Sequence, residues 1–119
     1  MKLRIAGGST DVSLPIFIMD TSDTNGAGLT GLAYNSSGLT CYYDRVGSAA
    51  AQLTLVSGTA SVSGAHSDGM FIEIDSTNMP GWYRLDLSDA IVAASVTSVG
   101  IHMQGATNMA PLAIEIQLT

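Results

Sequence analysis

Short segments in which apolar and polar side chains alternate recur along the whole 119-residue chain. Alternation with a period of two places every second side chain on one face, which is typical of half-buried β-strands. Clusters of Gly, Ser, Asn and Asp separate these segments, and such clusters favour turns. The alternation predicts a buried face made of Ile72, Ile74, Tyr83, Leu85, Leu87, Val99, Ile101, Ile114 and Ile116.

The spacing of these segments predicts an all-β fold, an antiparallel immunoglobulin-like β-sandwich of about seven to nine short strands. A small closed β-barrel is the alternative, because alternation alone does not distinguish the two architectures. The segment Ser88–Ala94 predicts one short crossover helix that begins with a serine cap. No linker interrupts the pattern, so residues 1–119 are predicted to form a single domain.

One local motif favours the immunoglobulin-like version of the sandwich. Gly81 stands two residues before Tyr83, which opens an alternating segment. This arrangement resembles the tyrosine corner, in which the hydroxyl group binds the backbone just upstream. A plain turn followed by an aromatic strand residue is the alternative explanation.

Charged side chains are scarce and mostly acidic. They make up 12% of the chain, and four Lys and Arg against ten Asp and Glu give a net charge of −6. Nucleic acids and anionic membranes attract clustered cations, so neither is an expected partner. The longest apolar run, Leu14–Met19, is far shorter than the roughly 20 residues that span a bilayer, so no membrane insertion is expected. No secretion signal opens the sequence and Cys41 is the only cysteine, which predicts synthesis in the cytoplasm without a disulfide.

Candidate groups for catalysis or metal binding are few, and each has a simpler structural explanation. His66 and Asp68 share a Ser- and Gly-rich loop, but no Gly-x-Ser-x-Gly nucleophile motif accompanies them. The segment Asp20–Gly26 has half of a calcium-loop pattern, and the same residues favour a tight turn. We therefore expect no catalytic residue, no metal site and no cofactor. Three further acidic residues are predicted to be solvated carboxylates on polar strand faces: Glu73, Asp75 and Asp86.

Several apolar and aromatic side chains are predicted to point outward, which favours a protein partner. In Leu14–Met19, placing Ile16 and Ile18 in the core leaves Phe17 and Met19 on the opposite face. A central strand covered on both faces within the domain is the alternative explanation for this segment. The predicted protein-interface candidates are Phe17, Met19, Tyr42 and Trp82.

Five segments carry a resemblance to a known group of proteins: Gly31–Leu39, Tyr42–Tyr43, Gly69–Asp75, Asn78–Leu87 and Gly105–Met109. They resemble small, uncharacterised virion structural proteins of tailed bacteriophages, of the decoration, neck or tail-fibre type. The resemblance implies a non-enzymatic structural component of a virion: a capsid decoration, head–tail neck or tail and fibre attachment protein. Its expected partners are other virion proteins and copies of itself. Its expected location is the virion, after synthesis in the host cytoplasm.

A carbohydrate-binding or receptor-recognition module is the alternative function. In that case exposed Trp82, Tyr42 or Tyr43 would stack on the sugar rings of a host-surface glycan. The placement of the aromatic side chains distinguishes the two functions. Aromatic residues packed against another chain favour a structural role, whereas an open groove with a nearby Asp or Asn favours sugar binding.

Overall fold

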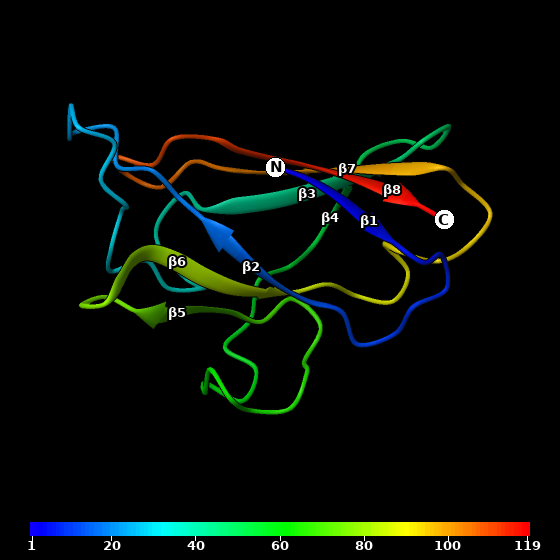
Figure 1. Cartoon of the computed structure of the whole chain (residues 1–119), viewed down its shortest axis with the longest axis horizontal. Helices are drawn as coiled ribbons and strands as arrows, with labels where there is room; N and C mark the ends of the chain where they lie inside the picture. Colours follow the sequence, from blue (N-terminus) through cyan, green and yellow to red (C-terminus); the bar gives the residue numbers. More distant parts are fainter.

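Eight strands and no α-helix make up the computed structural model, which describes all 119 residues. A five-stranded "large sheet" has the order β1 (Lys2–Ile5), β8 (Leu112–Leu118), β7 (Ser98–Gln104), β3 (Thr40–Arg45) and β4 (Ala51–Gln52). A three-stranded "small sheet" has the order β2 (Ser13–Phe17), β6 (Met79–Asp86) and β5 (Phe71–Asp75). Figure 1 shows the two sheets as two layers. The predicted all-β, two-sheet fold is confirmed, and the structure contains no helix with the length and hydropathy of a membrane span.

The core lies between the two sheets and is built by the alternating side chains of the longer strands. Inward-facing residues of β6, β7 and β8 are almost completely removed from solvent, as the alternation predicts. Ile16 and Ile18 from the segment around β2 join them, while Phe17 between them faces the other way. The prediction of burial is confirmed for Tyr83, Leu85, Leu87, Val99, Ile101, Ile114 and Ile116.

Strand β5 has the opposite orientation to the predicted one. Phe71 pairs with Leu85 and is buried with it, whereas Ile72 pairs with Arg84 and lies on the outer face of the small sheet. Ile72 and Ile74 are therefore only partly buried, and their assignment to the core was wrong. The β-bulge between Glu73 and Asp75 further interrupts the simple alternation in this edge strand.

Strand β1 departs from a wholly antiparallel arrangement, because it pairs in parallel with β8. The pairing brings Lys2 opposite Glu115, and the two side chains form an ion pair of 3.6 Å at the surface. The N-terminal ammonium group donates to the carbonyl of Ala113 at 3.1 Å. In Figure 1 the blue β1 accordingly lies beside the red β8.

The predicted helix over Ser88–Ala94 is wrong, since this connection is a series of turns. The guanidinium group of Arg45 donates to the carbonyls of Ala90, Ile91, Ala93 and Ala94 at 2.9–3.2 Å. A segment of this length forms a helix poorly without outside support. Here four of its carbonyl groups accept hydrogen bonds from a distant side chain instead.

Tyr83 does not form a tyrosine corner. Its hydroxyl donates to the carbonyl of Leu29 at 2.6 Å and accepts from the amide of Leu32 at 3.2 Å, both more than 50 residues upstream. Burial raises the pKa of Tyr83 to about 12, which keeps the hydroxyl protonated. Gly81 is needed because its φ is 90° and a Cβ would lie 2.5 Å from the Cα of Gly28. The immunoglobulin-like connectivity stays a prediction.

Candidate interaction surfaces

The outer face of the small sheet carries an apolar surface, here called the small-sheet face: Pro15, Phe17, Ile72, Ile74 and Trp82. Phe17 and Trp82 are cross-strand partners, and their ring centroids lie 5.7 Å apart with a tilt of 53°. Such tilted aromatic pairs are favourable beyond the area they bury. The fold thus brings together two of the four predicted interface residues.

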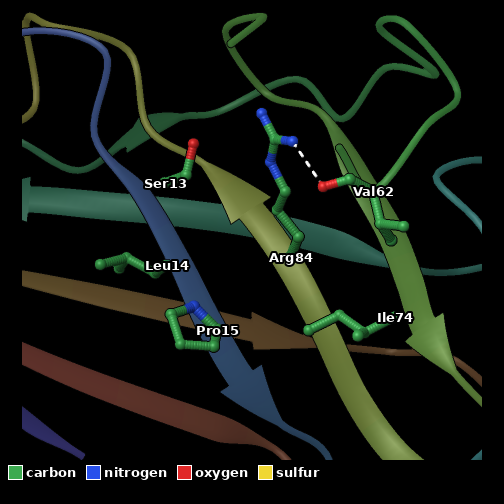
Figure 2. Close-up of a pocket in the computed structure, with 6 residues that line it drawn as sticks. All are labelled: Ser13, Leu14, Pro15, Val62, Ile74 and Arg84. Atoms are coloured by element: carbon green, nitrogen blue, oxygen red, sulfur yellow. Dashed lines mark hydrogen bonds between the residues drawn. The ribbon is translucent and has the colours of Figure 1, made fainter. Parts of the chain in front are cut away.

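A hollow of about 210 Å³ opens at one end of the small-sheet face. Figure 2 shows its lining, with Pro15 on β2, Ile74 on β5, and Arg84 between them on β6. Val62, from the loop between β4 and β5, closes one side, and its carbonyl accepts from Arg84 at 2.9 Å. The hollow is therefore a mainly apolar depression beside one partly buried cation, Arg84.

The charge of Arg84 is balanced by Asp86, which is fully buried. The guanidinium group binds both carboxylate oxygens, at 2.8 and 3.0 Å, and also donates to the carbonyl of Gly64. Burial alone would raise the pKa of Asp86, but hydrogen bonds from Arg84, the amide of Ser67 and the hydroxyl of Ser13 lower it below 3.8. The prediction that Asp86 is solvated was wrong, because the loop 57–69 folds back over this end of the sheet.

His66 holds the same loop to the end of β6. Its Nε2 lies 2.9 Å from the carbonyl oxygen of Leu87, and its Nδ1 lies 3.4 Å from Asp11 and 3.6 Å from Asp68. Each ring nitrogen therefore faces an oxygen acceptor rather than a serine hydroxyl. The arrangement anchors a loop, and it lacks the nucleophile contact that a Ser-His-Asp site needs.

The remaining chemical candidates also have structural roles. Asp20 accepts hydrogen bonds from the hydroxyl and the amide of Ser22. Both bonds lower the pKa of Asp20, and the bond from the hydroxyl has the larger effect. Asp75 accepts from the amides of Thr77 and Asn78 in the turn before β6. No group of three or more His, Cys, Asp or Glu side chains is placed to hold a metal ion. Burial raises the pKa of Cys41 to about 12, which leaves its thiol protonated.

The other two predicted interface residues, Met19 and Tyr42, are not part of the aromatic pair. Met19 is exposed two residues beyond Phe17. Tyr42 lies on the outer face of the large sheet and is 44% exposed. It lines a second hollow of about 300 Å³, together with Asp44, His102 and the small residues Gly100 and Ala113. Tyr43, its neighbour, packs partly against the core.

Comparison of the chain with protein-family models, with curated proteins and with solved structures gives no match. Function is therefore inferred from the two outer faces and from the resemblance of the sequence. Sequence reasoning had missed two features of these faces. The buried pair of Arg84 and Asp86 depends on a loop that returns from elsewhere in the chain. The grouping of Gly100 with Tyr42 and Ala113 in the second hollow depends on strand register.

Proposed function

We propose that the protein is a non-enzymatic structural component of a tailed-bacteriophage virion, a capsid decoration, head–tail neck or tail and fibre attachment protein. It acts through contacts with other virion chains and with copies of itself. The resemblance of the sequence to virion proteins of tailed bacteriophages suggests that the protein belongs to a phage particle. The small-sheet face, with the paired rings of Phe17 and Trp82, is the observation that supports a protein contact.

The composition of this face fits an interface between proteins. Interface centres are enriched in aromatic side chains and depleted in charge, and Trp is frequent among the residues that dominate binding energy. Here an aromatic pair lies among Pro15, Ile72 and Ile74, and the charge of Arg84 is already neutralised by Asp86. A partner that covers the face would thus bury apolar surface without leaving a charge unpaired.

The face is a better contact surface than the edge of β2. Pro15 occupies the middle of this edge strand and has no amide hydrogen to donate. Proline at such a position discourages another chain from extending the sheet. We therefore expect partners to pack on the small-sheet face instead of adding a strand beside β2.

Trp82→Glu is expected to weaken association with purified phage particles, or with further copies of the chain, by about 30-fold or more. This corresponds to about 2 kcal/mol, the usual threshold for a dominant interface residue. The introduced carboxylate stays solvated in the free chain and becomes unpaired only in the complex, so the variant should still melt cooperatively. Co-sedimentation with particles and light scattering measure the two kinds of association.

Val46→Glu is the matched control, because Val46 is exposed just beyond β3, on the large sheet, away from the small-sheet face. It should associate as the unmodified chain does. A Trp82→Glu variant that associates equally well contradicts a contact through this face. An unmodified chain that stays monomeric and ignores the particles contradicts the structural role itself.

A further inference from the structure

The outer face of the large sheet has a hollow whose floor lacks large side chains. Strand register aligns Tyr42, His102 and Ala113 in one outward-facing row, and Asp44, Gly100 and Glu115 in the next. All six residues are exposed. The glycine and the alanine thus lie between longer polar or aromatic side chains, at the centre of the sheet.

The glycine at position 100 is not required by the fold. Its φ is outside the left-handed region, and a Cβ built on it meets no atom within 4 Å. Gly100 pairs with Asp44 on one side and with Glu115 on the other, and no β-bulge interrupts either pairing. Glycine inside a strand is destabilising relative to alanine, because it loses more backbone freedom on folding. Strain, crowding and bulges are thus excluded as causes, and a glycine within a strand also marks sites where a ligand or another backbone approaches closely.

The charged and polar side chains at the rim of the hollow indicate which class of ligand fits it. Asp44 has no cation within ion-pair distance, whereas the nearby Glu115 is paired with Lys2. A free carboxylate in a chain of net charge −6 disfavours an anionic ligand. The polar rim also disfavours a purely apolar ligand, because its groups would lose water without gaining hydrogen bonds.

A neutral saccharide satisfies both restrictions. Its hydroxyl groups can donate to Asp44 and exchange hydrogen bonds with His102, while its C–H groups can contact the electron-rich ring face of Tyr42. The hollow of about 300 Å³ is at the lower end of the range for ligand pockets, which suits one or two sugar rings. We propose that this hollow is a binding site for a neutral hexose unit of a glycan. The site is on the sheet opposite the small-sheet face and does not depend on the proposed structural role.

The test titrates the ¹⁵N-labelled chain with methyl glycosides of glucose, galactose, mannose and N-acetylglucosamine at millimolar concentration. At least one sugar should give saturable amide shifts clustered in residues 42–44, 100–102 and 113–115. Gly100→Val should abolish them, because the branched side chain fills the floor of the hollow while suiting a strand. Asp44→Asn should weaken binding by about tenfold or more, since it removes a charged acceptor.

Two controls separate this proposal from the structural role. Trp82→Glu should bind the sugar as the unmodified chain does, and Gly100→Val should associate with particles normally. If no sugar shifts these amides, or if Gly100→Val still binds the sugar, the proposal is wrong. It is also wrong if Gly100→Val impairs association as strongly as Trp82→Glu does, because the hollow is then a protein contact.

Discussion

Leu85→Asp is expected to leave no cooperatively folded protein. Leu85 is fully buried at the centre of the small sheet, where its cross-strand partners are Leu14 and Phe71. An unpaired carboxylate in such surroundings costs several kcal/mol, against a total stability of about 5–15 kcal/mol for a domain. Thermal unfolding followed by circular dichroism should show no transition. A soluble variant that melts cooperatively would contradict this packing.

Ile72→Asp is the matched control on the neighbouring strand. Ile72 faces outward opposite Arg84, so the introduced carboxylate would remain near solvent and beside a cation. We expect a folded protein whose stability changes by no more than about 1 kcal/mol, as is usual for surface substitutions. Equal damage from both substitutions would instead support the inward orientation of Ile72 that the sequence had predicted.

Asp86→Ala is expected to destabilise the protein by about 3–5 kcal/mol, the usual loss when one member of a buried ion pair is removed. Arg84 would keep its charge in a largely buried site with no counter-ion, and the amide of Ser67 would lose its acceptor. Chemical denaturation measures the change in unfolding free energy. Asp44→Ala removes an exposed carboxylate and should change the stability by less than about 0.5 kcal/mol. An equally small effect of Asp86→Ala would contradict the role assigned to this pair.

The same pair makes stability depend on pH in the acid range. The pKa of Asp86 is lower in the folded chain than its ordinary 3.8, so the unfolded chain binds a proton more readily. The stabilisation is therefore complete above the ordinary value and is lost as the pH falls through the folded value. Melting temperatures measured down to low pH should fall more steeply for the unmodified chain than for Asp86→Asn. Parallel curves would contradict this assignment.

The parts of the fold that were predictable are those in which polarity alternates along long strands. Leu85 in β6 stands between Arg84 and Asp86, and Ile116 in β8 stands between Glu115 and Gln117, so alternation favours one orientation for each strand. In β5 the deciding residue was Glu73, which was expected to face water. It shares a face with Tyr83 and lies at the sheet edge, where its carboxylate accepts from the amide of Gly31 at 3.1 Å.

The features that could not be predicted depend on segments that meet only in the folded chain. By its place in the alternating pattern Asp86 looks like a solvated residue. It is buried because the loop 57–69 folds back over it. The segment that was expected to form a helix has a series of turns instead, and its carbonyl groups accept hydrogen bonds from Arg45, which lies more than 40 residues away in the sequence. Among the interface candidates, the sequence identified Phe17 and Trp82 as separate exposed residues, while their proximity follows from the register of β2 and β6.

The position of β8 between β1 and β7 has a consequence for the order of folding. The paired residues of β1 and β8, such as Lys2 and Glu115, are 113 positions apart in the sequence, so a very large loop must close before these contacts form. During synthesis, β1 and one edge of β7 lack their partner until Leu112–Leu118 leaves the ribosome. Completion of the large sheet is therefore a late and slow event, and chains that have not reached it expose two strand edges to their neighbours.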